Sequence, residues 1–127
     1  MLADEAALNE LSHRVIGAAL IVIGRLGPGF AEKVYENALA HLLRKDGLAV
    51  AQQRKATVWF DGVVVGAYFV DLLVEDALVV ELKTVRTLDD AHRAQCLNYL
   101  RATGLRLCLL INFGAPRLEI RRVVNRL

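Results

Sequence analysis

Three charged residues interrupt an apolar stretch near the middle of this 127-residue chain. In residues 68–84, YFVDLLVEDALVVELKT, they are Asp71, Glu81 and Lys83, and they stand where buried strands would carry apolar side chains. A charge inside a sheet is costly unless it is paired, hydrated or bound to a metal. Two carboxylates suit Mg²⁺ or Mn²⁺, and a nearby ammonium can orient a water molecule or meet a phosphate. The pattern indicates a divalent-metal site; a surface hairpin with a weak ion pair is the alternative.

The loop of this hairpin decides whether the carboxylates can meet. Side chains alternate along a strand, so Glu81 and Lys83 share a face. An odd-numbered loop, such as residues 75–77, places Asp71 directly opposite Glu81. A two-residue loop would pair Asp71 with Val80 and send the carboxylates to opposite faces. A metal site therefore predicts the three-residue loop.

Hydrophobic periodicity and turn signals predict the elements around the hairpin. A bulge or bend is expected at Gly66, the strand at 107–113 is apolar enough to be central, and the strand at 118–124 alternates as an edge strand would. Together these elements predict an α/β sandwich with a mixed sheet, in the order α-α-β-β-β-α-β-β. The predicted elements are helices at 4–23 and 30–45, strands at 50–60, 63–74 and 78–83, a helix at 87–102, and strands at 107–113 and 118–124.

The second predicted helix places two glutamates and a tyrosine on one side. Glu32 and Glu36 are favoured near a helix N-terminus by the dipole and usually face water, unless that side covers the face carrying the acidic pair. Tyr35 is expected to pack with its hydroxyl in water. Periodicity leaves these alternatives open.

On the third predicted helix, His92, Gln95 and Tyr99 lie close to one line. A polar stripe of this kind usually faces solvent, and a lone histidine is more often a surface residue than a ligand.

Charge is distributed unevenly along the chain. Residues 1–81 carry seven Lys/Arg and eleven Asp/Glu, a net −4, whereas residues 82–127 carry nine and three, a net +6. The arginines of the second half either form a phosphate-facing surface or are scattered in solvent. They are Arg86, Arg93, Arg101, Arg106, Arg117, Arg121, Arg122 and Arg126.

Composition and length predict one soluble, cytoplasmic domain covering residues 1–127. The two cysteines, Cys96 and Cys108, form no disulfide framework and suit reduced thiols. The acidic N-terminus lacks the order of a signal peptide, and the apolar run at 15–24 is too short to span a bilayer, so no membrane association is expected. Crowded apolar residues in the second half of the first helix imply that this half is well buried or meets a partner chain.

These motifs, in this order, resemble the PD-(D/E)XK nuclease superfamily, in particular its RecB-like branch with a Q-x-x-x-Y helix. The resemblance is closer still to the small bacterial GxxExxY proteins. Their name motif stands here as Gly29-Phe30-Ala31-Glu32-Lys33-Val34-Tyr35, and the block AQCLNYLRATG followed by LLINFG is also similar. The resemblance covers about residues 11–122. One departure is Val70, which precedes Asp71 where the superfamily name has proline.

The resemblance implies a restriction-endonuclease-like core and an Mg²⁺-dependent (or Mn²⁺-dependent) phosphodiesterase acting on nucleic acid, with DNA favoured. Carried over by position, Asp71, Glu81 and the backbone carbonyl of Leu82 would bind the metal, and Glu32 would complete its shell. Lys83 would position or activate the attacking water.

Gln95 and Tyr99 would orient the site or touch the phosphate. Arg86, Arg93 and His92 are further candidates for contact with nucleic acid. Because so small a chain has few loops to grip a duplex, a homodimer is expected to assist. The alternative is a nuclease fold without cleavage that acts as a nucleic-acid-binding or protein-interaction module.

Overall fold

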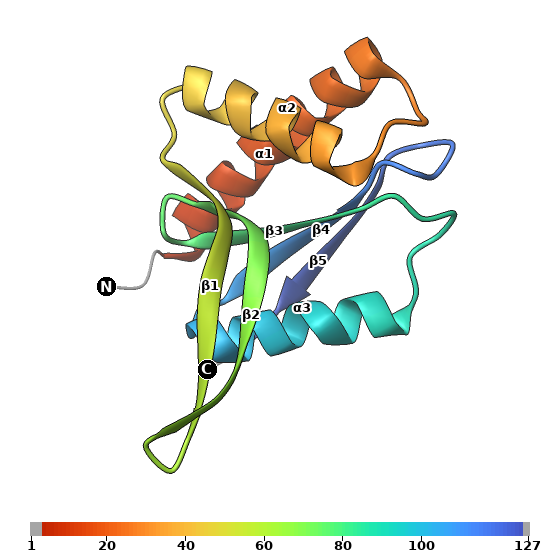
Figure 1. Ribbon diagram of the computed structural model, residues 1–127. Coiled ribbons are helices and arrows are strands. Elements are labelled where there is room, and N and C mark those ends of the chain that lie inside the picture. Colours follow the sequence, from red (N-terminus) through yellow and green to blue (C-terminus); the bar gives the residue numbers. More distant parts are fainter. Residues whose placement is uncertain (1–3, 126–127) are drawn as a thin grey trace.

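The computed structural model describes residues 4–125, in which three helices flank a five-stranded sheet (Figure 1). The predicted element order α-α-β-β-β-α-β-β is confirmed. The elements are α1 (Glu5–Leu26), α2 (Glu32–Lys45), β1 (Val50–Phe60), β2 (Val63–Val74), β3 (Leu78–Lys83), α3 (Asp90–Thr103), β4 (Leu107–Asn112) and β5 (Glu119–Val124).

The strands form one mixed sheet in the order β1-β2-β3-β4-β5. Strands β1, β2 and β3 are an antiparallel meander, β4 lies parallel to β3, and β5 returns antiparallel to β4. The parallel pair requires a crossover, which α3 supplies. The expected mixed sheet and the edge position of the last strand are both confirmed.

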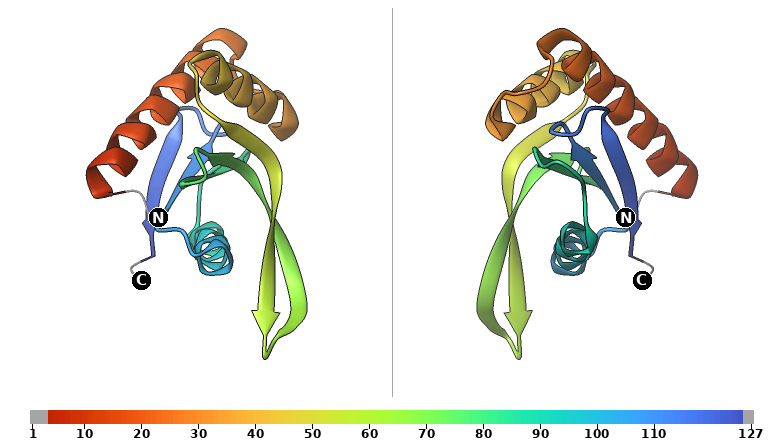
Figure 2. Two further views of the ribbon diagram at one scale, coloured as in Figure 1. Left: turned by 90° about the vertical axis from the view of Figure 1, so that its left-hand side faces the viewer. Right: turned by 90° about the vertical axis from the view of Figure 1, so that its right-hand side faces the viewer.

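Helices α1 and α2 pack on one face of the sheet and α3 on the other (Figures 1 and 2). Strand β4 and most of β3 are buried because helices cover them on both sides. This explains why residues 107–113 are apolar without alternation. Cys96 and Cys108 lie in the core on the α3 side, where both are buried and free.

Helix α1 is longer than its sequence pattern predicts. It begins after Asp4, whose side chain accepts a hydrogen bond from the Ala7 N–H at 2.7 Å, and it ends at Gly27, which has a φ of +72°. Its 22 residues are long and apolar enough to cross a membrane by length and composition alone, a test that core helices of soluble proteins also pass. Val22 is buried against the sheet side, but Leu20 and Ile21 are exposed, so the expected burial of the second half is only partly confirmed.

Strands β1 and β2 continue past the rest of the sheet as a two-stranded ribbon, which Figure 2 shows projecting from the body. We call residues 56–69 the arm. Asp61 and Gly62, both with positive φ, form its tight turn. Strand β2 is continuous rather than broken at Gly66, and the expected irregularity is a register shift between Val58, paired with Gly66, and Trp59. The arm is a twisted extension of the sheet's outer pair.

Candidate metal and phosphodiester-cleaving site

The hairpin between β2 and β3 has the three-residue loop that a shared carboxylate site requires. Val74 pairs with Leu78 and Leu72 with Val80, a register that continues to Asp71 opposite Glu81. Beyond the Leu72–Val80 pair, hydrogen bonds from backbone N–H groups to carboxylate side chains replace the backbone hydrogen bonds between the two strands. The Asp71 N–H donates to Glu81 Oε1 at 2.8 Å, and the Leu82 N–H donates to Asp71 Oδ2 at 2.8 Å. The two carboxylates therefore meet where the strands separate.

Burial makes this pair electrostatically costly. The side chain of Glu81 is 3% exposed, and burial, followed by the negative charge of Asp71, raises its pKa to about 9. Burial also raises the pKa of Asp71, although the Leu82 N–H and the Gln53 amide oppose the rise. Two carboxyl groups whose charged forms are both disfavoured either hold a proton or are stabilised in the charged form by a bound cation.

Helix α2 brings a third carboxylate to the same place. Glu32 lies in its first turn and is half-buried. Burial raises the pKa of Glu32, the charge of Asp71 raises it further, and the charge of Lys83 lowers it. Glu32 is therefore near enough to Asp71 and Lys83 for their charges to act on it, and we call Glu32, Asp71 and Glu81 together the acidic pocket.

The third helix contributes the polar side of this pocket. Lys83 Nζ donates to Gln95 Oε1 at 2.8 Å, which joins the end of β3 to α3. Tyr99 is buried; burial raises its pKa, and the charges of Glu81 and Asp71 raise it further. The expectation that this stripe usually faces solvent is wrong for Tyr99 and only partly right for Gln95, because α3 rests on the sheet with these positions inward.

His92, in contrast, takes part in capping the N-terminus of α3. Its N–H donates to Asp89 Oδ1 at 3.2 Å and its Nδ1 accepts from the Asp89 N–H at 3.1 Å, which completes a capping box. Arg86 and Arg93 are exposed beside it. Contact of these three residues with nucleic acid stays a prediction.

The arginines of the second half do not act as one group. Arg122 donates to Ser12 Oγ at 2.9 Å and to Asn9 Oδ1 at 2.7 Å, so it ties β5 to α1. Arg121 lies 3.5 Å from Glu119. Arg126 lies outside the described residues. Arg121 and Arg122 have structural partners, so they do not contribute to a single phosphate-facing arginine surface.

Gln53, which sequence reasoning missed, and Glu36, whose role it left open, both lie beside the site. Gln53 lies between Gln52 and Arg54, which pair with Leu72 and Val70 of β2, and it has a φ of +52°, which is strained for a residue with a side chain. Its Nε2 donates to Asp71 Oδ1 at 3.0 Å and to Glu36 Oε1 at 2.8 Å. Glu36 is only 2% exposed and also accepts from Lys33 and Gln52. The only sequence signal was the Gln52-Gln53 pair inside a predicted strand.

Tyr35 fixes the loop that leads into α2. Its hydroxyl donates to the Gly27 carbonyl at 2.6 Å and accepts from the Phe30 N–H at 3.2 Å, while its ring stacks on Phe113 with centroids 4.7 Å apart. The expected packing role is confirmed, but the hydroxyl is bonded to the backbone rather than to water. Gly29, with a φ of +101°, completes the turn. The glycine and tyrosine of the motif thus position the first turn of α2, which carries Glu32.

The donor set suits a hard divalent cation in its chemistry. Glu32, Asp71 and Glu81 offer carboxylate oxygens, and their raised pKa values reflect burial and mutual repulsion that a bound cation would offset. Within residues 4–125, no three His, Cys, Asp or Glu side chains are arranged so as to hold a metal ion directly. One oxygen of Asp71 and one of Glu81 are instead bonded to backbone N–H groups. A cation bound here would compete with these two hydrogen bonds.

Comparison with known proteins agrees with this fold. A family model described as the PD-(D/E)XK nuclease superfamily matches residues 9–123. No curated protein matches the chain. A solved structure titled "Crystal structure of SSO0001" is similar, with a TM-score of 0.58 and 17% sequence identity. The similarity covers 76% of this chain and 51% of that one, so the chain spans about half the length of that protein.

At 17% identity the structural likeness speaks for the fold alone, and it confirms the expected restriction-endonuclease-like α/β core. The family match covers nearly all of the sequence and includes every residue of the acidic pocket. From its sequence and its fold, the chain belongs to the PD-(D/E)XK nuclease superfamily.

Proposed function

We propose that this protein is a metal-dependent nuclease that hydrolyses phosphodiester bonds of nucleic acid, with DNA as the favoured substrate. The observation that carries the proposal is the meeting of Asp71 and Glu81 where β2 and β3 separate, next to Lys83. Within the superfamily, we place the chain among the GxxExxY proteins of the RecB-like branch. The support for this placement is the Gly29–Tyr35 motif, whose tyrosine and glycine build the turn before Glu32.

The proposed metal is Mg²⁺ or Mn²⁺. Asp71, Glu81 and the Leu82 carbonyl would hold it, and Glu32 would complete the shell from α2. When bound, such an ion lowers the pKa of a coordinated water and offsets the charge that grows on the phosphate. The acidic pocket without a cation would repel a phosphate, so binding of the ion is a condition for binding of the substrate.

The remaining polar groups position the reacting atoms. Lys83 would hold the attacking water or the charged phosphate oxygens with its ammonium group. Gln95 fixes the direction of the Lys83 side chain through its 2.8 Å bond. Tyr99 borders the acidic pair and would orient the phosphate with its hydroxyl, which stays protonated because its pKa is raised.

A cleavage assay on single-stranded and double-stranded DNA and RNA, with Mg²⁺ or Mn²⁺, tests this function. We expect the wild-type chain to cleave at least one substrate and Lys83→Ala to lose about 10²- to 10³-fold in rate while it still binds the metal. Lys45→Ala is the matched control, because Lys45 is exposed at the far end of α2. Wild-type cleavage by Lys83→Ala would refute the role of Lys83, and no cleavage of any substrate by the wild-type chain would refute the function.

One observation favours a second candidate, a nuclease fold that binds a protein partner without cleavage. The arm exposes large apolar side chains on both of its faces, with Trp59 64% and Phe60 73% exposed. Trp59 pairs with Val64 and Phe60 with Val63, so each face carries a bulky cross-strand pair. Such an exposed patch is typical of an interaction surface.

We propose that a second copy of the chain covers the tip of the arm, around Trp59 and Phe60, and that the protein is a homodimer. Residues 56–69 contain only one charged residue, Asp61, so the arm offers nothing to attract a phosphate backbone or a charged partner. An apolar ribbon with a single charge can pack against its own copy, as a two-fold interface requires. A two-stranded ribbon is also only marginally stable alone, which favours its cover by a partner.

We propose a cytoplasmic location. Cys96 and Cys108 are both free and buried, which suits a reducing compartment.

A further inference from the structure

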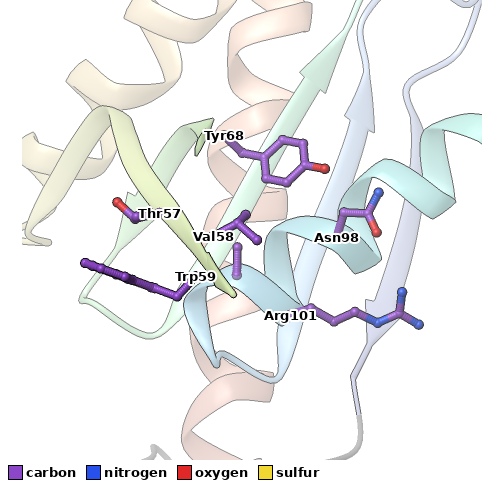
Figure 3. Close-up of a pocket in the computed structure, with 7 residues that line it drawn as sticks. Thr57, Val58, Trp59, Tyr68, Asn98 and Arg101 are labelled. Carbon is purple, nitrogen blue, oxygen red and sulfur yellow. The ribbon is translucent and has the colours of Figure 1, made fainter. Parts of the chain in front are cut away.

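A groove runs between the arm and α3. It is a cavity of about 390 Å³, within the range of pockets that hold small organic ligands. Figure 3 shows Tyr68 and Val58 on the side of the ribbon that faces α3, opposite Asn98 and Arg101, whereas Thr57 and Trp59 point the other way. The groove therefore has one aromatic wall and one polar wall.

The aromatic wall connects the groove to the proposed catalytic residues. The ring of Tyr68 packs edge-on against Tyr99, with centroids 5.3 Å apart and planes at 69°. Tyr99 lies about one turn after Gln95 on α3, and Gln95 accepts the hydrogen bond from Lys83 at the end of β3. On α3, Arg101 lies six residues after Gln95, a rise of about 9 Å along the helix axis. A strand that leaves the acidic pocket would reach Arg101 within one or two nucleotides.

The polar wall carries one positive charge and no negative charge. Arg101 is exposed and, among residues 4–125, has no carboxylate partner; the side-chain amide of Asn98 has no hydrogen bond within the same residues. A guanidinium suits a phosphate, an amide suits the edge of a base, and a tyrosine ring offers a stacking face. A duplex presents its phosphate backbone and keeps its bases stacked inside. Only Arg101 could therefore contact it.

We propose that this groove binds an unpaired stretch of nucleic acid next to the scissile phosphate, with a base on Tyr68 and a phosphate on Arg101. The proposed nuclease would then act on single strands or on the unpaired ends and branches of a duplex. The inference rests on the proposed function, since it names the substrate form for the same site.

Binding measured in nuclease-silenced protein tests the groove separately from catalysis. In the Lys83→Ala background, fluorescence anisotropy with a labelled single-stranded 12-mer and with a blunt duplex of the same length gives the two dissociation constants. We expect tighter binding of the single strand. Tyr68→Ala should weaken it about 10-fold, within the range for loss of one stacked base, and Tyr68→Phe should restore it.

Phe69→Ala is the matched control for the tyrosine, because Phe69 is exposed on the same strand but on the opposite face. Arg101→Ala should reduce the slope of log Kd against log salt by about 0.7, and Arg25→Ala, on the distant helix α1, should not. The inference fails if Tyr68→Ala and Phe69→Ala bind alike, if the duplex binds as tightly as the single strand, or if no oligonucleotide binds. Failure of the proposed function is a different result, the absence of metal-dependent cleavage by wild-type protein.

Discussion

Charged side chains are usually exposed and apolar ones buried, and the two halves of the β1–β2 ribbon depart from this rule in opposite ways. The inner half buries a charge: Asp71 lies beside Glu81 in a pocket closed by Gln53. The outer half, the arm, exposes Trp59 and Phe60 to solvent. Each arrangement costs free energy in the isolated chain, the first by desolvation and the second by contact of apolar surface with water. Both halves are therefore expected to be completed by a ligand, and the two ligands differ in kind.

Removal of the charge in the inner half should have the largest effect. We expect Asp71→Ala to abolish measurable Mn²⁺ binding by calorimetry and to lower the cleavage rate by about 10³-fold or more, because several kcal/mol of charge stabilisation depend on the ion. Asp90→Ala, which removes an exposed carboxylate at the start of α3, should leave both unchanged. If Asp71→Ala bound Mn²⁺ with wild-type affinity, Asp71 would not be a ligand of the metal.

Charge placed on the outer half should change assembly and leave the pocket intact. We expect the double variant Trp59→Lys and Phe60→Lys to shift the protein from dimer to monomer, with a dimer dissociation constant raised at least about 30-fold, because exposed aromatic residues dominate interfaces. Sedimentation velocity measures the change, and Mn²⁺ affinity of the variant serves as the control. A wild-type chain that stays monomeric at high concentration would refute the dimer through the arm.

The buried carboxylate also predicts how stability depends on pH. The pKa of Glu81 is about 9 in the folded protein and near 4.5 when unfolded, so between these values the folded state binds the proton more tightly. The free energy of unfolding of the metal-free protein should therefore fall as the pH rises from about 5 to 9. Saturating Mn²⁺ should oppose this fall, since the ion favours the ionised carboxylate.

Glu81→Gln tests the same point at fixed pH. Without metal, we expect its melting temperature at pH 8 to rise by roughly 3–6 °C, the shift that about 1 kcal/mol causes in a domain of this size. Its Mn²⁺ binding should be lost. A variant that is less stable than wild type at pH 8 would show that Glu81 is ionised and satisfied without a cation.

The smallest effect concerns Gln53, which bonds both Glu36 and Asp71. Gln53 has a φ of +52°, and a glycine adopts this backbone more easily than a residue with a Cβ. Gln53→Gly and Gln53→Ala both remove the bonds to Glu36 and Asp71, so their difference isolates the backbone. Gln53→Gly should be the more stable by about 1 kcal/mol in chemical denaturation. Equal stability would show that the backbone relaxes there.

The inner half was largely predictable from sequence because strand periodicity and loop length determine its register. Asp71 and Glu81 interrupt a continuous apolar run, and side-chain alternation with a three-residue loop then places them together. Glu36 was not predictable in the same way, because an acidic residue in the first turns of a helix usually faces water. Its burial depends on Gln53, whose strained backbone turns the amide toward it. No local pattern encodes that turn.

For the outer half, the sequence predicts the hairpin but not its position relative to the rest of the sheet. Three valines at 63–65 and the Asp61-Gly62 turn predict a hairpin, and the structure has one. The pattern does not indicate that this hairpin continues beyond β3, because projection depends on where the neighbouring strand ends. The C-terminal half of α1 was misjudged for a related reason, since the exposure of Leu20 and Ile21 depends on how much of the sheet the helix covers.

A crystal structure of the protein soaked in Mn²⁺, with anomalous diffraction to locate the ion, tests the central claim most directly. We predict an anomalous peak between Asp71 and Glu81, within bonding distance of the Leu82 carbonyl, with the Glu81 side chain released from the Asp71 N–H. A pocket without a peak at saturating Mn²⁺, with the Glu81–Asp71 hydrogen bond intact, would contradict the account.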